Sequence, residues 1–370
     1  MSESGTRSPW KTLGINVAVL FCSLAVAFLT GEVVVRAAMK DRITLFPRYH
    51  TDAHYGEFTL RRIRPNSEFR HTSVDGSWTF VTNAQGFRND RDFSYEKPAG
   101  TIRVMSLGDS HTQGYEVRQD RTFSAVIERY LTEQGVDAEV LNTGVSGFST
   151  AEEVAFFENE GVRYHPDFVV VGFYANDFED NLKAGLYRLD DDGHLQVART
   201  THIPGVRIQN VIYSIPMVAW LGEHSYFYSL LFNSTWEFFK TRLAKDASDA
   251  AVEYAIPTSE EVSGYEIDLT AALLADLHRF CMDRGIGLII LDIPQVSGKS
   301  SLPPSLRARI GELSDGYVDS TALLADYRNV VQLHVPHGAR HISEFTHAIL
   351  GVDAARQITA WLRGEQADNP

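Results

Sequence analysis

The sequence contains little cysteine and no cluster of positive charge. Its two cysteines are Cys22, in an N-terminal apolar run, and Cys281, in a predicted helix, so a disulfide framework is excluded. The 34 basic residues are outnumbered by 48 acidic ones, for a net charge of −14. Because nucleic acid binding needs clustered Lys and Arg, we expect no nucleic acid partner. With 44% hydrophobic and 22% charged residues among 370, the chain has the composition of a globular protein with a sizeable core.

An uncharged apolar run lies near the N-terminus. Residues 13–30 carry no charged side chain, and the apolar character continues to residue 35. A helix of this length matches the hydrocarbon core of a bilayer, so we predict a tail over residues 1–12 and a transmembrane anchor over residues 13–35. A cleaved signal peptide is the alternative, because Ala25-Val26-Ala27 resembles a small-x-small cleavage site. Basic residues flank both sides of the run, so they do not fix its orientation.

The remaining pattern indicates an α/β fold. Short apolar runs typical of buried strands alternate with segments of helical periodicity, which predicts a three-layer α/β/α domain with a mostly parallel central sheet over residues 101–365. The predicted strands cover residues 101–107, 138–142, 167–174, 286–293 and 330–335, and the predicted helices cover residues 124–131, 151–159, 269–284 and 344–363. Residues 41–100 read as a β-rich prelude.

The segment over residues 182–264 breaks this rhythm and is predicted to be an inserted, lid-like segment. It is rich in aromatic residues that could contact substrate or the membrane surface. We favour the interpretation that they form a small core of the insertion itself, because apolar residues at helical spacing usually pack. These aromatics are Trp220, Tyr226, Phe227, Tyr228, Phe232, Trp236, Phe238 and Phe239.

Three blocks at predicted strand ends carry the residues suited to chemistry. The first reads SLGDSHTQG over residues 106–114 and places the hydroxyl of Ser110 beside a tight glycine turn. Open α/β sheets place reactive groups at such carboxyl ends. Taken alone, this block could simply cap a helix through Asp109 and Ser110. The second block reads NTGVSGFST over residues 142–150, and the third reads GFYAND over residues 172–177.

The order and spacing of these blocks resemble the SGNH (GDSL-like) hydrolase family. The resemblance runs over residues 101–362 without the insertion, and residues 83–88 together with the anchor look like the membrane-attached bacterial members. It implies a serine nucleophile at Ser110 and an oxyanion hole formed by the Gly147 N–H and the Asn176 amide, with the Ser110 N–H as a third donor. Such preorganised donors stabilise an acyl-transfer intermediate. The alternative for Asn176 is a turn residue before Asp177.

The family also implies a histidine base just before the closing helix. We predict His341, because Ser343 two residues later is a suitable N-cap for that helix. Gly338 stands where the family has its acid, so the acid comes from elsewhere or the pair acts as a dyad. The alternative register, Glu344-x-x-His347, restores an acid. An imidazole base of this kind predicts a rising pH–rate limb with an apparent pKa near ~6–7.

The resulting prediction is a membrane-anchored, extracytoplasmic serine esterase that acts on an acyl ester, by preference an acetyl ester, of an envelope glycan or lipid. Two alternatives stay open: O-acyl transfer to a polysaccharide, and a catalytically silent ligand-binding domain. We expect no cofactor and no metal. A metal cluster formed by His334, His337 and His341 is a further interpretation, which their mixed strand and loop placement does not favour.

Overall fold

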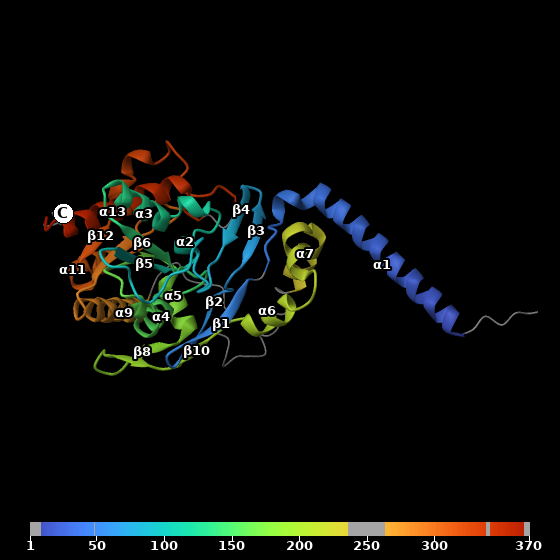
Figure 1. The fold of residues 1–370 in the computed structure, drawn as a ribbon, viewed down its shortest axis with the longest axis horizontal. Helices are drawn as coiled ribbons and strands as arrows, with labels where there is room; N and C mark the ends of the chain where they lie inside the picture. The colour runs from blue at the N-terminus through green and yellow to red at the C-terminus, as the bar shows by residue number, and fades with distance from the viewer. Residues whose placement is uncertain (1–8, 48, 236–262, 338–340, 366–370) are drawn as a thin grey trace, which may run out of the picture.

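A parallel five-stranded sheet forms the centre of the protein (Figure 1). The computed structural model describes residues 9–47, 49–235, 263–337 and 341–365. The strand order is β12-β11-β7-β5-β6, and every neighbouring pair is parallel. These strands are β5 (Ile102–Gly108), β6 (Ala138–Asn142), β7 (Phe168–Phe173), β11 (Gly287–Asp292) and β12 (Gly316–Val318). The predicted parallel sheet is confirmed. The predicted strand at 330–335 is wrong, because the fifth strand is the three-residue β12 and residues 330–335 form turns and a single bridge to Ile342.

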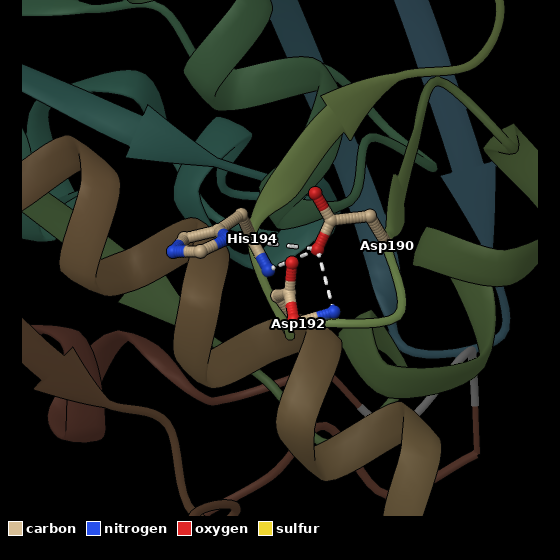
Figure 2. A group of neighbouring side chains, drawn as sticks. All are labelled: Asp190, Asp192 and His194. Atoms are coloured by element: carbon tan, nitrogen blue, oxygen red, sulfur yellow. Dashed lines mark hydrogen bonds and ion pairs between the residues drawn. The ribbon is translucent and has the colours of Figure 1, made fainter.

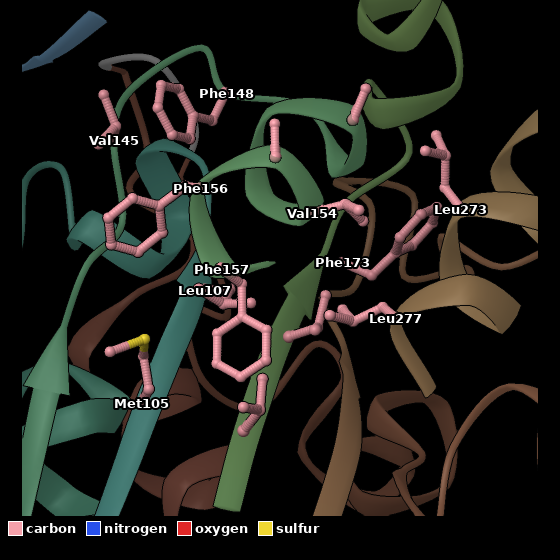
Figure 3. Close-up of a cluster of buried hydrophobic side chains, with 14 of the residues drawn as sticks. Met105, Leu107, Val145, Phe148, Val154, Phe156, Phe157, Phe173, Leu273 and Leu277 are labelled. Carbon is pink, nitrogen blue, oxygen red and sulfur yellow. The ribbon is translucent and has the colours of Figure 1, made fainter. Parts of the chain in front are cut away.

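Helices cover both faces of the sheet, as the α/β/α prediction requires. Alternate residues of β7 point to opposite faces, so Val169 and Val171 belong to one buried cluster and Val170 to the other. On the first face, Met105 and Leu107 of β5 lie near Phe157, Leu273 and other side chains of two helices (Figure 3). The covering helices are α4 (Thr150–Asn159), α5 (Asp177–Ala184) and α9 (Gly264–Met282) on this face, and α3 (Phe123–Glu133) and α13 (Glu344–Leu362) on the other.

The β-rich prelude shares its core with the main domain. Its strands form two antiparallel hairpins, β1 (His50–Tyr55) with β2 (Phe58–Ile63), and β3 (Glu68–Ser73) with β4 (Gly76–Val81). The rings of Tyr49, Phe69 and Phe80 stack with centroids 4.3 and 5.2 Å apart, and all three belong to the same buried cluster as β5. The prelude is therefore packed against the sheet rather than tethered beside it.

The insertion packs on the prelude. It contains a small hairpin, β8 (Tyr187–Leu189) with β9 (Leu195–Val197), then β10 (Thr201–His202), α6 (Val206–Tyr213) and α7 (Val218–His224). β10 extends the prelude sheet by pairing in parallel with β2. Arg64 of the prelude donates to Asn210 Oδ1 at 2.9 Å and lies over the ring of Tyr213. The described part thus shares a core with its neighbours, contrary to the predicted separate core. Trp236, Phe238 and Phe239 lie outside the described residues.

The N-terminal helix α1 (Pro9–Met39) is apolar enough to cross a membrane. Its mean hydropathy reaches 2.2 within Trp10–Arg42, and a signal sequence has the same property. Its last turns contact the insertion (Figure 1). The Glu32 carboxylate accepts hydrogen bonds from Ser225 Oγ at 2.8 Å and from the Phe227 N–H at 2.9 Å. Glu32 therefore caps the helical segment that begins at residue 226, almost two hundred residues further along the chain.

We expect the substitution Glu32→Ala to loosen this segment. The Phe227 N–H would lose its acceptor, and the loss of a cap costs ~1 kcal/mol, or about a fivefold change in an opening equilibrium. Amide hydrogen exchange of residues 226–228 in the full chain measures the effect, since exchange reports local opening. Asp41→Ala removes an exposed carboxylate just after α1 and serves as the control. Equal protection in both variants would contradict the capping role.

Candidate active site

The turn after β5 holds Ser110 at the carboxyl edge of the sheet. β5 ends at Gly108, and α2 (Ser110–Gln113) is a single turn that follows directly. Asp109 caps it by accepting a hydrogen bond from the His111 N–H at 2.7 Å. A Cβ atom at Gly108 would collide with Thr112, so only glycine lets the strand turn into α2 at this point. Ser110 is left half-buried.

His341 faces the Ser110 hydroxyl. Its Nε2 lies 2.7 Å from Ser110 Oγ, although 231 residues separate the two in the chain. The backbone holds the imidazole in place, because the Val335 N–H donates to the His341 carbonyl at 2.8 Å. Ser343 accepts a hydrogen bond from the Thr346 N–H, and its predicted place as the N-cap of α13 is confirmed. The contact is suited to transfer of a proton from Ser110 to His341.

Burial keeps the His341 imidazole neutral. The side chain lies between the rings of His111 and Tyr115, whose centroids are 4.5 and 4.9 Å away. Burial lowers the pKa of His341 to about 4, and the nearby charge of Glu116 acts in the opposite direction. Its Nδ1 is buried and has no hydrogen-bond partner among the described residues. The imidazole is therefore a ready proton acceptor at neutral pH, but nothing orients it through Nδ1.

The Glu344–His347 alternative does not form a pair. Glu344 makes an ion pair with Arg118, 2.5 Å from its Nη2. His347 is fully buried, and its Nδ1 accepts a hydrogen bond from the Phe123 N–H at 3.1 Å. Burial lowers the pKa of His347 to about 3. His347 thus joins α13 to α3 rather than contacting Ser110.

Gly147 lies in the loop that leads from β6 to α4. Its φ of +77° is a conformation that favours glycine, and within the described chain its N–H donates no hydrogen bond to the protein. The loop is braced by its neighbour: the Ser146 N–H donates to Gln113 Oε1 at 2.8 Å, and Gln113 Nε2 donates to the Tyr49 hydroxyl at 3.2 Å. A Cβ atom at Gly147 would lie 2.6 Å from Arg61 Nη2. This arrangement leaves the Gly147 N–H available to an oxyanion.

Asn176 reaches the site but is engaged with carboxylates. It follows β7 at the N-cap position of α5. Its Nδ2 donates to Asp180 Oδ2 at 2.9 Å and lies 3.4 Å from Asp109 Oδ2, while its buried Oδ1 has no partner within the described residues. The amide therefore stands beside the residue that precedes Ser110. To stabilise an oxyanion, one of its hydrogens must change partner.

Buried carboxyl groups lie behind the serine turn. Burial raises the pKa of Asp109 to about 7, against hydrogen bonds from the His111 N–H and Asn176 that favour its charged form. Burial also raises the pKa values of Glu153 and Asp177 well above the usual range, with repulsion among the three groups adding to it. Burial and mutual repulsion therefore favour the neutral forms of these groups over their charged forms.

The histidines of the metal interpretation have separate partners. His334 Nε2 lies 3.0 Å from the Pro294 carbonyl, and His337 Nδ1 lies 2.8 Å from Asp75 Oδ1, whereas His341 faces the nucleophile. A different trio, Asp190, Asp192 and His194, gathers in the exposed turn between β8 and β9 (Figure 2). Asp190 Oδ1 accepts hydrogen bonds from the N–H groups of the other two residues at 3.0 and 2.9 Å. This trio is accounted for as an Asx-type closure of the hairpin.

The serine and the histidine meet at the carboxyl edge of the parallel sheet of an α/β fold. A serine–histidine pair in this position is suited to acyl transfer. The sequence profile of the GDSL-like Lipase/Acylhydrolase family matches residues 106–331, more than half of the chain. The chain therefore belongs to this family of ester-bond hydrolases. The match includes Ser110, Gly147 and Asn176, and it ends before His341.

Individual relatives are more distant. An arylesterase of Vibrio mimicus is 26% identical over 125 residues, which cover 30% of this chain and 62% of that protein, so the chain spans less than two thirds of this relative. Among solved structures, the acetylxylan esterase Axe2 from Geobacillus stearothermophilus is 14% identical, covering 70% of this chain and 94% of its own, with a TM-score of 0.38. A two-domain esterase active on acetylated mannans is 12% identical, covering 74% and 53%, also with a TM-score of 0.38. None of these similarities identifies a substrate for this chain.

The site also contains side chains that the sequence patterns did not single out. The prelude contributes several of them, and α2 and the loop after it contribute the rest. One signal was present in the sequence, because His111 belongs to the serine block and Tyr115 and Glu116 follow directly after it. The residues are Tyr49, Arg61, His71, His111, Tyr115 and Glu116.

We expect His341→Ala to reduce kcat/KM for a p-nitrophenyl ester by several powers of ten, because Ser110 loses its proton acceptor. His347→Ala should lower the melting temperature through the cavity and the unpaired Phe123 N–H, with kcat per folded molecule nearly unchanged. An essential His347 beside a dispensable His341 would refute the pairing.

In the unmodified chain the rising limb of kcat/KM should lie near pH 4, the pKa of His341, instead of the 6–7 expected for an exposed imidazole.

Proposed function

We propose that this chain is a serine ester hydrolase in which Ser110 is the nucleophile and His341 the base. The observation that carries the proposal is the 2.7 Å contact between Ser110 Oγ and His341 Nε2 in a member of the GDSL-like family. Ser110 Oγ attacks the ester carbonyl carbon while His341 Nε2 takes the hydroxyl proton. The same proton then passes to the departing alcohol oxygen, and His341 next takes a proton from the water that releases the acid.

The oxyanion donors in this proposal are the N–H groups of Gly147 and Ser110 and the Asn176 amide. The open Gly147 N–H supports its role directly. Asn176 takes part by exchanging one of its carboxylate acceptors for the oxyanion, which offers a negative charge of similar strength. Each such donor contributes roughly 3–4 kcal/mol to the transition state in other enzymes. No organic cofactor or metal enters these steps.

We further propose that the chain is a single-pass membrane protein, anchored through residues 13–35, with its catalytic domain outside the cytoplasm. The apolar length of α1 supports the anchor. A domain so placed meets acylated glycans and lipids of the envelope, and we propose an acyl ester of that kind, such as an acetyl ester, as the substrate class. Acyl transfer to a sugar hydroxyl would use the same residues, with the sugar in place of water.

A fluorophosphonate probe tests the nucleophile. It should label the unmodified chain at Ser110, and Ser110→Ala should abolish both labelling and hydrolysis of p-nitrophenyl acetate while leaving the melting temperature within about a degree. Ser146→Ala removes the hydroxyl of the neighbouring loop and should still be labelled. Release of acetate with and without an added oligosaccharide then separates hydrolysis from transfer. Undiminished labelling of the Ser110 variant would remove the basis of the proposal.

A further inference from the structure

Glu116 is held in a backbone conformation that favours glycine. Its φ is +61°, and its side chain is buried. A residue other than glycine in this region costs about 1–3 kcal/mol, and such strain concentrates at functional sites. Glu116 lies two residues after Gly114, in the loop that leaves the serine turn. Glycine would be more stable at this position. Stability therefore does not explain why a buried carboxylate is found there.

The contacts of this loop lead to the catalytic base. Glu116 Oε1 lies 3.4 Å from His71 Nε2 of β3, and both side chains are buried. The Tyr115 ring packs between two imidazoles, with centroids 4.4 Å from His71 and 4.9 Å from His341. The segment formed by Tyr115 and Glu116 therefore forms one wall of the His341 pocket. This segment places the Glu116 carboxylate beside the aromatic and imidazole rings of the pocket.

The base needs a nearby negative charge that its own segment does not provide. When His341 takes the Ser110 proton, a cation forms in a buried site, which is costly without compensation. His341 Nδ1 has no hydrogen-bond partner within the described chain, and glycine occupies position 338, where the family has its acid. The electrostatic coupling is mutual: Glu116 acts to raise the pKa of His341, and His341 acts to lower that of Glu116. Among the described residues, the titratable groups that interact electrostatically with His341 also include the imidazoles of His71, His111, His334 and His347.

We propose that Glu116 is the carboxylate that stabilises the His341 imidazolium, acting through space from the loop of the nucleophile. Its role is that of a positioning residue, because it does not contact the reacting atoms, and the inference rests on the proposed ester hydrolysis. The proton itself still moves from Ser110 Oγ to His341 Nε2 and on to the departing alcohol. This negative charge comes from the loop that follows the serine turn.

Two substitutions separate charge from strain. Glu116→Gln removes the charge and keeps the shape, and Glu116→Gly removes the charge and relieves the positive φ. Both should lower kcat about tenfold or more, because the imidazolium is less stable in the transition state. Both should also move the titration of His341 to lower pH, because the charge that favours its protonated form is gone; NMR of the imidazole and the limb of kcat/KM measure this. The glycine variant should melt at the same or a higher temperature.

Glu344→Gln is the matched control, since it removes a carboxylate three residues from His341 that is paired with Arg118. It should leave the titration of His341 and kcat unchanged. Glu116→Asp should restore part of the rate. An active unmodified chain whose kcat and His341 titration are the same in all Glu116 variants would overturn the role of Glu116 and leave the proposed function intact. An inactive, unlabelled unmodified chain would overturn the proposed function itself.

A second, independent observation concerns exposed apolar side chains of the insertion. Six large apolar side chains between residues 208 and 231 are about half exposed or more, between 48% and 68% of their surface. They lie on α6, on the turn before α7, on α7 and on the helical segment after it, which packs beside the last turns of α1 (Figure 1). The residues are Ile208, Val211, Ile215, Met217, Trp220 and Leu231. Exposed apolar side chains gathered in one short segment indicate a contact surface.

The length of α1 places this surface at the edge of a bilayer. α1 has 31 residues, whereas about 20 residues cross the hydrocarbon core, so its last turns extend to the headgroup layer. The last turn of α1 holds the insertion: Arg36 lies over the ring of Tyr226 and donates to the His224 carbonyl at 2.7 Å. Aromatic and basic residues are typical of this interfacial layer. The exposed face thus begins at the level where the anchor leaves the lipid.

We infer that the α6–α7 face of the insertion lies in the interfacial layer of the same bilayer that α1 enters, which fixes the catalytic domain against the membrane surface. This inference rests on the proposed anchor. A second copy of the chain is the other occupant of an apolar face, and it is distinguished by the test below. Lipid is favoured because the helical segment that carries Leu231 packs on the end of the apolar anchor through Tyr226, Phe227 and Leu230.

Lipid-quenched fluorescence tests the inference. The full chain is reconstituted in phosphatidylcholine vesicles with brominated acyl chains, which quench tryptophans that enter the bilayer. Trp220→Phe should reduce the quenched fraction of emission, whereas Trp361→Phe, which removes a tryptophan of similar exposure on α13, should not. An unchanged quenched fraction in the Trp220 variant, or quenching that depends on dimer formation, would overturn the inference. Failure of the chain to float with the vesicles would overturn the anchor itself.

Discussion

Close approach of the backbone at the end of two strands is the constraint on which the site depends. Gly108 of β5 and Gly172 of β7 face each other in register, and Thr112 fills the space that a side chain at either position would need. Gly144, in the loop after β6, packs against the backbone of α2 in the same way. Because these glycines let three chain segments approach closely, the serine turn, the Gly147 loop and the start of α5 meet at one edge of the sheet. A Cβ atom at these glycines would push the segments apart.

The prelude completes this arrangement from outside the family match. Arg88 is buried and donates to the carbonyl oxygens of Gln113, Gly114 and Val117, so it fixes the loop that carries Glu116. Burial lowers the pKa of Arg88 to about 9, yet it stays charged at neutral pH. Tyr49, just before β1, contacts Gln113 of α2, and His71 of β3 contacts Glu116. Residues 41–100 therefore pack against the serine turn and the loop after it.

The sequence was most informative where burial and chemistry produce local patterns. Continuous apolar runs located β5, β6, β7 and β11 within two residues. The family resemblance of the polar blocks pointed to Ser110, and the N-cap at Ser343 pointed to His341. The edge strand β12 has only three residues, which is too short to show a strand-like pattern of apolar residues. The fifth strand was therefore predicted at the more apolar run over residues 330–335. The acidic shift of the His341 pKa depends on rings that arrive from three separate segments, and the positive φ of Glu116 depends on the packed loop. The lowered pKa of His341 and the positive φ of Glu116 both arise from tertiary packing, so no local sequence pattern predicts them.

The separation of Ser110 and His341 along the chain has a consequence for biosynthesis. His341, the proposed base, lies 231 positions after Ser110, the proposed nucleophile, and chains are made at about 5–20 residues per second. Roughly 10 to 50 seconds therefore pass between the synthesis of the two residues. All five strands of the central sheet are made before His341, so a nascent chain holds the serine for a time without its proposed proton acceptor.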